Sequence, residues 1–376
     1  MFILDLLAHI ASTILVGYLS VTTLVADFIA PLFPTETTPT EIALHEDAPE
    51  DDDLHRLPSR YEYGGIIPSI LLENAQYQQA AVGANAPTDQ ATSTPLEIPE
   101  EVIARSLVNI FCQYTTDSYI RTTTGTGYFI HANGVILTNA HVAQFLLFEN
   151  TDIVQDAACT IRSGNPAVAQ YKAELLYIPP AWISEHAALV SDETPVGTGE
   201  RDYALLYVSA SATDTPLPTV FPHITINTNL VSRALENDRV FVAGYPGEAL
   251  FRDGADAKLT PLVAATTVSQ IYTFGSNYGD IFSIHNSEVG KHGASGGPII
   301  NEDGEAIGLI VTKGNAETEG PQSLRGLTLS YVDRTITEET GFSLEENMRG
   351  NLAHRGTVFK EALSPFLAQL LAFELR

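Results

Sequence analysis

Short apolar runs rich in β-branched and aromatic residues alternate with turn residues from residue 100 onward. Runs of this length and composition are typical of β-strands. They fall into two groups of about six, on either side of a proline-rich link at Thr215–Pro222. The first group comprises Val102–Tyr114, Gly127–His131, Val135–Leu137, Cys159–Arg162, Ala173–Ile178 and Tyr203–Val208. The second comprises Arg239–Ala243, Ala264–Phe274, Ile281–Ile284, Ile299–Ile300, Ala306–Thr312 and Gly326–Val332.

This pattern predicts an all-β domain over residues 100–345, built as two six-stranded antiparallel β-barrels at about 100–212 and 223–335. Asn133-Gly134, between two of the strands, predicts a type I′ hairpin turn. A helical tail is predicted over residues 346–376, because the apolar residues of Phe359–Leu375 are spaced as on an amphipathic helix. Pro365 fits the first turn of that helix, with Ser364 as its N-cap.

The first 30 residues predict a membrane anchor helix, because Leu6–Ala26 contains no formally charged residue. About 20 such residues span a bilayer core. A cleaved signal peptide is the alternative. The first basic residue is Arg56, so charge does not fix the orientation, and we prefer the short amino end inside.

Residues 31–99 predict a flexible acidic tether rich in proline and threonine. Much of its charge lies in the acidic run Glu46–Asp53. One apolar stretch, Tyr63–Leu72, interrupts the tether, and we expect it to dock on the folded domain or on a partner.

Charge and cysteine content narrow the function classes. The 376 residues include 46 acidic and 19 basic ones, and the formal net charge of −27 disfavours binding to nucleic acid or anionic lipid. The two cysteines, Cys112 and Cys159, lack the spacing of a metal site, so no metal is expected. Two buried thiols or one disulfide both fit the sequence.

Three motifs far apart in the sequence carry candidate chemistry. Ser295 lies in Gly293-Ala-Ser-Gly-Gly-Pro298, which is typical either of a nucleophile on a tight loop or of an ordinary glycine-rich hairpin. His141 follows a predicted strand, and Asp202 stands at the entrance of another. A serine nucleophile needs a base and a group that orients the base, and these two residues supply one of each. Taken singly, His141 and Asp202 also fit purely structural roles.

In this order, the motifs around His141, Asp202 and Ser295 resemble those of the chymotrypsin/trypsin-like serine peptidases, most closely the HtrA-type bacterial branch. The resemblance covers about residues 101–335. It implies that His141 is the general base, that Asp202 orients it and that Ser295 is the nucleophile. The main-chain N–H groups of Gly293 and Ser295 are expected to form the oxyanion hole.

Departures from the family pattern also carry information. Ala294 replaces the acidic residue that precedes the serine in trypsin-type members, so activation through that ion pair is disfavoured. The chain after Val332 is too short for the PDZ domain of HtrA-type enzymes. Val289 stands where a trypsin-type pocket holds an acid, so a small or medium aliphatic residue is expected at the P1 position of the substrate. Val311 and Thr312 are further pocket candidates.

Cys112 and Cys159 lie on strands that a closed six-stranded barrel can make neighbours, so we expect a disulfide and a location outside the cytoplasm.

The expected function is therefore that of a membrane-anchored, extracytoplasmic serine endopeptidase that acts through an acyl-enzyme on protein or peptide substrates, without a cofactor and without nucleic acid. The sequence does not fix its oligomeric state. One alternative is a catalytically inactive, protease-like peptide-binding protein of the cell envelope. Another is a structural envelope protein, but this alternative gives the loop around Ser295 no function.

Overall fold

The computed structural model describes residues 100–115, 120–149, 151–154, 156–191, 198–248, 250, 257–275, 278–285, 287–290, 292–313 and 323–375. The predicted anchor helix, the acidic tether and Tyr63–Leu72 lie outside these residues. Within the described ranges, no helix is both long enough and apolar enough to cross a bilayer.

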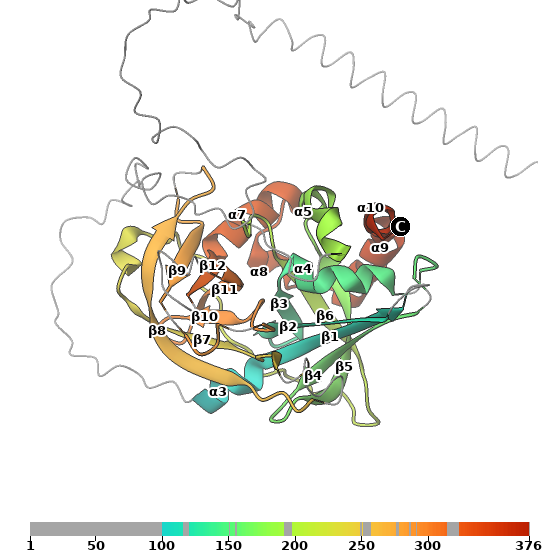
Figure 1. Ribbon diagram of the computed structural model, residues 1–376, viewed down its shortest axis with the longest axis horizontal. Coiled ribbons are helices and arrows are strands. Elements are labelled where there is room, and N and C mark those ends of the chain that lie inside the picture. Colours follow the sequence, from blue (N-terminus) through green and yellow to red (C-terminus); the bar gives the residue numbers. More distant parts are fainter. Residues whose placement is uncertain are drawn as a thin grey trace, which may run out of the picture. The chain divides into compact units, whose positions relative to one another are not determined.

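The first barrel is closed by antiparallel pairing in the order β1-β2-β3-β6-β5-β4. Its strands are β1 (Leu107–Thr115), β2 (Ile120–His131), β3 (Val135–Thr138), β4 (Asp156–Ser163), β5 (Val168–Tyr177) and β6 (Ala204–Ser211). The barrel lies on the right of Figure 1.

The second barrel closes in the order β10-β11-β12-β9-β8-β7 and lies on the left of Figure 1. Its strands are β7 (Arg239–Gly244), β8 (Leu262–Tyr272), β9 (Ile281–Ile284), β10 (Pro298–Ile300), β11 (Ala306–Lys313) and β12 (Leu324–Thr328). The prediction of two six-stranded antiparallel barrels is confirmed.

One helix precedes β1, others lie between strands, and the last ones follow the second barrel. They are α3 (Glu100–Ser106), α4 (Ala140–Ala143), η2 (Gln144–Phe148), α5 (Pro180–His186), η3 (Ala187–Ser191), η4 (Arg233–Leu235), α7 (Leu329–Thr340), α8 (Leu344–Asn347), α9 (Leu352–Ala362) and α10 (Ser364–Glu374).

Two segments predicted as strand are helical. Val102–Ser106 belongs to α3, where acidic residues open the first turn and Arg105 donates to Glu101 one turn earlier at 3.0 Å. Leu329–Val332 opens α7, because the hydroxyl of Thr328 accepts the N–H of Tyr331 at 3.1 Å as an N-cap. Local interactions, an ion pair within α3 and the N-cap of α7, therefore outweigh the apolar pattern at these two places.

The turn at Asn133-Gly134 is not of type I′. The loop between β2 and β3 has three residues, Ala132–Gly134, because His131 pairs with Val135. Gly134 has φ +81°, whereas Asn133 does not have a positive φ. A type I′ turn needs a positive φ at both central residues, and a three-residue hairpin needs it only at the last.

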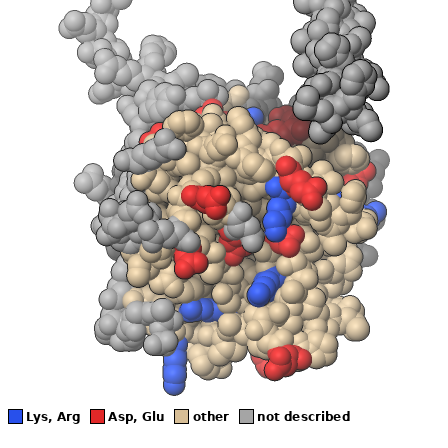
Figure 2. Space-filling model, turned by 90° about the vertical axis from the view of Figure 1, so that its right-hand side faces the viewer, with Lys and Arg blue, Asp and Glu red and all other residues tan. Residues whose placement is uncertain are grey.

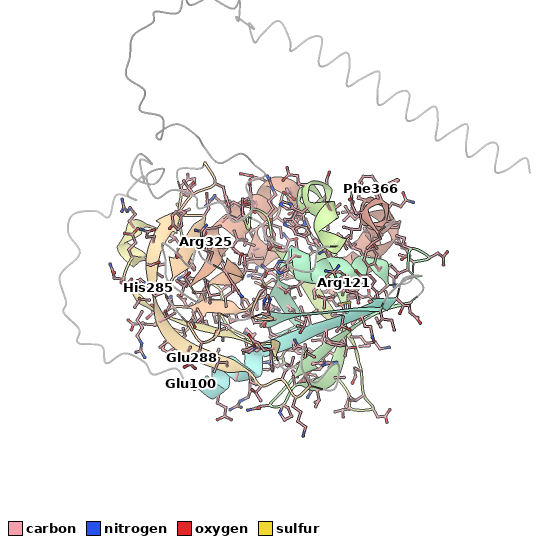
Figure 3. The ribbon with its side chains drawn as sticks, viewed as in Figure 1. Glu100, Arg121, His285, Glu288, Arg325 and Phe366 are labelled. Atoms are coloured by element: carbon pink, nitrogen blue, oxygen red, sulfur yellow. A yellow bond between two sulfur atoms is a disulfide. The ribbon has the colours of Figure 1, made fainter. Side chains whose placement is uncertain are left out.

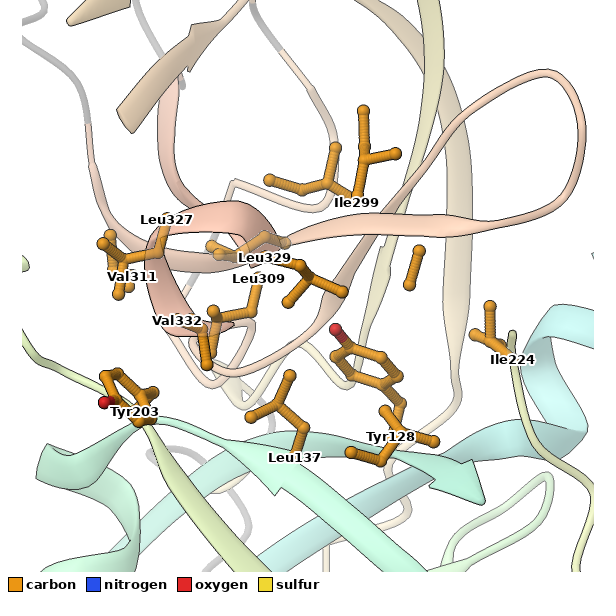
Figure 4. Packing of buried hydrophobic residues seen from close by; sticks show 14 of the residues in the cluster. Tyr128, Leu137, Tyr203, Ile224, Ile299, Leu309, Val311, Leu327, Leu329 and Val332 are labelled. Carbon is orange, nitrogen blue, oxygen red and sulfur yellow. The ribbon is translucent and has the colours of Figure 1, made fainter. Parts of the chain in front are cut away.

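The two barrels share a hydrophobic core. Tyr128 and Leu137 of the first barrel face Leu309 of the second barrel and Val332 of α7 (Figure 4). Tyr128, Leu137, Leu309 and Val332 have no exposed area. Burial of side chains this large fixes the barrels against each other.

The C-terminal helices cover the first barrel. Gly356 of α9 lies so close to β6 that an added Cβ would stand 2.4 Å from the ring of Tyr207. Helix α10 packs on α5 and η3, and Figure 3 shows Phe366 on its outer side. The predicted single helix is in fact the end of α9 followed by α10. The N-cap of α10 is Leu363 and not the predicted Ser364, because α10 begins at Ser364, just before Pro365.

Cys112 of β1 and Cys159 of β4 are direct cross-strand neighbours and form a disulfide. The bond joins two of the strands that close the first barrel.

Candidate active site

His141 and Asp202 are brought together although 61 positions separate them. His141 lies in the first turn of α4, just after β3, and Asp202 immediately precedes Tyr203 and β6. Because β3 and β6 are paired neighbours, with Thr138 opposite Ala204, the two side chains leave the sheet at the same edge.

The carboxylate of Asp202 accepts two hydrogen bonds from the same histidine. Its Oδ1 accepts the main-chain N–H of His141 at 2.9 Å, and its Oδ2 lies 2.7 Å from the ring Nδ1. A carboxylate only accepts at this distance, so Nδ1 carries a proton, and in the neutral form of such a ring Nε2 has the free lone pair. This is the tautomer that a general base needs.

The side chains of the His141–Asp202 pair are largely shielded from solvent. The side chain of Asp202 is 8% exposed and that of His141 is 21% exposed. Asn139 donates from Nδ2 to the main-chain oxygen of Asp202 at 2.8 Å, so the backbone on both sides of the pair is tied together. Hydrogen bonds to a charged acceptor gain strength in such a site.

The loop that carries Ser295 is bonded to the first barrel. The main-chain oxygen of Ser295 accepts the N–H of Thr126, in β2, at 2.8 Å. Gly296 has φ +86° and packs so tightly that an added Cβ would lie 2.0 Å from the main-chain oxygen of Thr126 and 2.5 Å from the hydroxyl of Thr138. Thr138 precedes His141 by three positions, so the serine loop and the histidine meet the same strand end.

The half-buried Ser295 has no hydrogen bond from its hydroxyl to the His141 ring in the described part of the chain. Catalytic hydrogen bonds are often long in unliganded enzymes and tighten when substrate binds.

Both peptide groups around Gly293 are held by hydrogen bonds. The oxygen of His292 accepts the N–H of Gly247 at 2.6 Å, and the oxygen of Gly293 accepts the hydroxyl of Thr126 at 2.6 Å. In a trans peptide the N–H points opposite to the C=O, so the N–H of Gly293 points away from Gly247. Gly293 itself has φ +91°, which only glycine adopts without strain.

No hydrogen-bond acceptor within the described residues takes the N–H of Gly293 or that of Ser295. Two free N–H groups beside a serine hydroxyl are able to bind a developing oxyanion.

The predicted pocket residues have low exposure. Val289 is 0% and Val311 is 3% exposed, whereas Thr312 is half-buried. Gly199, three positions before Asp202, lies against Val311, since an added Cβ there would be 2.9 Å from the Val311 side chain. Glu288, which precedes Val289, is exposed (Figure 3).

Sequence reasoning missed Thr126 and Gly247. Thr126 has no exposed area, and its hydroxyl also accepts the N–H of Tyr245 at 2.9 Å, so it joins two separate segments of the second barrel to β2. The motif Gly125-Thr-Gly127 was visible in the sequence, but the partners of its threonine lie more than 100 positions away.

Among the described residues, no cluster of three or more histidine, cysteine, aspartate or glutamate side chains is arranged to hold a metal ion.

Two packed antiparallel barrels, a hydrogen-bonded His–Asp pair and a serine on a glycine-bounded loop are the parts of a two-barrel peptidase. Residues 125–309 match the family model of the trypsin-like peptidase domain. Residues 125–309 therefore carry a trypsin-like peptidase domain, which agrees with the resemblance to the chymotrypsin/trypsin-like serine peptidases.

Similar solved structures include two forms of the Rv3671c protease from M. tuberculosis. The inactive form is 18% identical and has a TM-score of 0.37, with 63% of this chain and 90% of that chain covered. The active form is 19% identical and has a TM-score of 0.37, with 63% of this chain and 82% of that chain covered. Comparison with curated proteins finds no match.

Proposed function

We propose that this chain is a membrane-anchored, extracytoplasmic serine endopeptidase in which Ser295, His141 and Asp202 form the catalytic triad. The observation that carries the proposal is the carboxylate of Asp202, which binds both the main-chain N–H and the ring of His141. The peptidase family of the domain supports protein or peptide substrates.

In the proposed reaction, Oγ of Ser295 attacks the carbonyl carbon of the scissile bond while its proton passes to Nε2 of His141. The carbonyl oxygen becomes an oxyanion and accepts the N–H groups of Gly293 and Ser295. When the tetrahedral intermediate collapses, His141 gives its proton to the leaving amine, the C–N bond breaks and an ester remains on Ser295. Water, activated by the same imidazole, hydrolyses the ester and restores the serine.

Asp202 has two roles in this scheme. It holds the ring of His141 so that Nε2 faces the serine loop, and its negative charge stabilises the imidazolium formed during each step. Because its side chain is only 8% exposed, water weakens that interaction little.

For specificity we propose a small or medium aliphatic P1 residue. Val289 brings no charge to the position where a trypsin-type pocket has its acid, and the neighbouring Glu288 is exposed. Hydrolysis of a peptide library in which each amino acid occupies P1 tests this proposal, and cleavage chiefly after arginine contradicts it.

The disulfide between Cys112 and Cys159 supports a location outside the cytoplasm, where such bonds persist. The anchor is proposed from the uncharged stretch Leu6–Ala26. The face in Figure 2 has Lys and Arg side chains interspersed with Asp and Glu on a largely uncharged surface. The net charge of −27 disfavours a nucleic acid partner.

A fluorophosphonate probe tests the proposed triad, because it phosphonylates only an activated serine. We expect labelling of the wild type and its loss in Ser295→Ala and His141→Ala. Ser209→Ala, a change on β6 away from the serine loop, is the matched control and keeps full labelling. Labelling that survives in Ser295→Ala would assign the nucleophile elsewhere.

The missing hydrogen bond between the hydroxyl of Ser295 and His141, within the described residues, favours one second candidate: a protease-like protein that binds peptides without turnover. This candidate predicts saturable peptide binding by a wild type that the fluorophosphonate does not label. The two outcomes of one labelling experiment therefore separate the two functions.

A further inference from the structure

Asp202 follows a residue with an unfavourable backbone conformation. Arg201 has φ +55°, the left-handed region, and is one of two such non-glycine residues in the described part of the chain. Side chains other than glycine rarely adopt this conformation unless the surrounding structure holds them in it. The contacts that hold Arg201 therefore also decide where the carboxylate of Asp202 points.

Two of those contacts come from helix α7, beside the ion pair of Arg201 with Glu200 at 3.8 Å and the hydrogen bond from the N–H of Tyr203 to the oxygen of Arg201 at 2.9 Å. The main-chain N–H of Arg201 donates to the hydroxyl oxygen of Tyr331 at 3.2 Å, and its guanidinium Nε donates to Oε1 of Glu339 at 2.8 Å. The side chains of Arg201 and Glu339 are 26% and 21% exposed. Helix α7 therefore accepts hydrogen bonds from both the backbone and the side chain of Arg201, the residue before Asp202.

The residue after Asp202 is held by the same helix. The hydroxyl of Tyr203 shares a hydrogen bond of 2.8 Å with that of Thr335, and Tyr203 has no exposed area. Figure 4 shows Tyr203 in the same buried cluster as Val332 of α7. Asp202 is thus flanked on both sides by residues that α7 anchors.

Glu339 is fixed in turn by the first barrel. Its second carboxylate oxygen, Oε2, accepts the hydroxyl proton of Tyr177, in β5. Burial, followed by the neighbouring Tyr203 and Glu339, raises the pKa of Tyr177, so its hydroxyl remains a proton donor. Both carboxylate oxygens of Glu339 accept a hydrogen bond, one from Tyr177 and one from Arg201, and this fixes the orientation of the carboxylate toward Arg201.

We propose that Glu339 is a positioning residue for catalysis, which acts through Arg201 to hold the carboxylate of Asp202 against His141. This inference rests on the proposed function of Asp202. Glu339 lies outside residues 125–309, so the match to the peptidase family says nothing of its role.

The variant Glu339→Gln tests the proposal, because it keeps the shape of the side chain and removes its charge. Glu338→Gln is the matched control, since Glu338 is the adjacent exposed glutamate of the same helix. Each variant is assayed in the full chain for kcat and KM on a peptide substrate, for the pH profile of kcat/KM and for thermal unfolding.

We expect kcat of Glu339→Gln to fall by about tenfold with KM within about twofold of the wild type, because a displaced orienting group weakens the transition state more than substrate binding. The acid limb of the pH profile should move to lower pH, because a displaced carboxylate stabilises the imidazolium less. Glu338→Gln should leave all these quantities unchanged.

Arg201→Gly provides the second test, because glycine adopts φ +55° without needing a tether. In the Arg201→Gly background, the added Glu339→Gln change should lower kcat no further. Full additivity of the two changes would show that Glu339 does not act through Arg201 and would overturn the proposal.

A purely structural role gives a different result, in which Glu339→Gln lowers the unfolding temperature while kcat and the pH profile stay those of Glu338→Gln. That result overturns the positioning role and leaves the peptidase proposal intact. A wild type that neither hydrolyses peptides nor reacts with the fluorophosphonate overturns the proposed function itself, and the positioning role with it.

Discussion

Gly296, which follows the proposed nucleophile, has no room for a side chain, and this gives a sharp prediction. An alanine Cβ at this position would lie 2.0 Å from the main-chain oxygen of Thr126, whereas real Cβ atoms essentially never come within 3.0 Å of such an atom. In Gly296→Ala the serine loop must therefore move away from β2 by about 1 Å. A displacement of this size at a reacting group costs about a hundredfold in rate.

The stability cost of Gly296→Ala follows from two contributions. Alanine at φ +86° costs about 1–2 kcal/mol of backbone strain. The displaced loop also weakens the hydrogen bond from Thr126 to Ser295, which is 2.8 Å long in the structure and worth about 1 kcal/mol. The expected loss in the free energy of unfolding is about 2–3 kcal/mol, a large part of the stability of an ordinary domain.

Gly341→Ala is the control, because Gly341 has nearly the same φ, +79°, and nothing within 4 Å of an added Cβ. It should lose only the backbone contribution and keep full activity. Urea unfolding and the hydrolysis rate of a peptide substrate measure both effects. If Gly296→Ala matched Gly341→Ala in stability and stayed within about threefold of wild-type activity, the packing of the serine loop against β2 would be wrong.

Three further predictions concern the surroundings of the site. Thr126→Val removes the hydroxyl bonded to the oxygen of Gly293 and should lower kcat by up to about a hundredfold, as loss of an oxyanion donor does. Thr126→Ser keeps the hydroxyl and should keep most of the wild-type kcat. Equal rates for both variants would refute the role of the hydroxyl. Burial is the main cause that raises the pKa of Glu149 above its ordinary 4.5, so the folded state is destabilised once the carboxyl group ionises as pH rises past 4.5, and not at lower pH. Glu149→Gln should therefore stabilise the protein more at pH 7 than at pH 4. Urea unfolding at both pH values checks the sign. Replacing Cys112 and Cys159 by alanine opens a loop of 47 positions and should cost about 4 kcal/mol of unfolding free energy, whereas an unchanged urea midpoint would show that the bond adds nothing to stability.

The barrels could be predicted from the sequence because their strands are short apolar runs bounded by turn residues. The prediction for β9, Ile281–Ile284, coincides with the structure. The errors at α3 and α7 arose where apolar residues continue past a helix boundary. The apolar run through Val332 predicted a strand, whereas in the structure Thr328, a good N-cap residue, begins α7 inside that run.

Pairing of His141 with Asp202 was predicted from the resemblance of their motifs to those of the chymotrypsin/trypsin-like serine peptidases, and the structure shows the hydrogen bond between the two side chains. The contacts that hold the residues of the site in place could not be predicted. Arg201 and Glu339 are 138 positions apart, and Thr126 lies 167 positions from Gly293. Neither pair belongs to a local motif, so only the packing of the barrels and of α7 reveals these contacts.

The most direct test of the proposed triad is the pre-steady-state hydrolysis of an activated ester, followed by mass mapping of the acyl group. We expect a rapid burst of about one product molecule per chain, with the acyl group on Ser295, and no burst in Ser295→Ala or His141→Ala. Turnover of the ester without a burst, or an acyl group mapped to another residue, would contradict the proposed roles of Ser295 and His141.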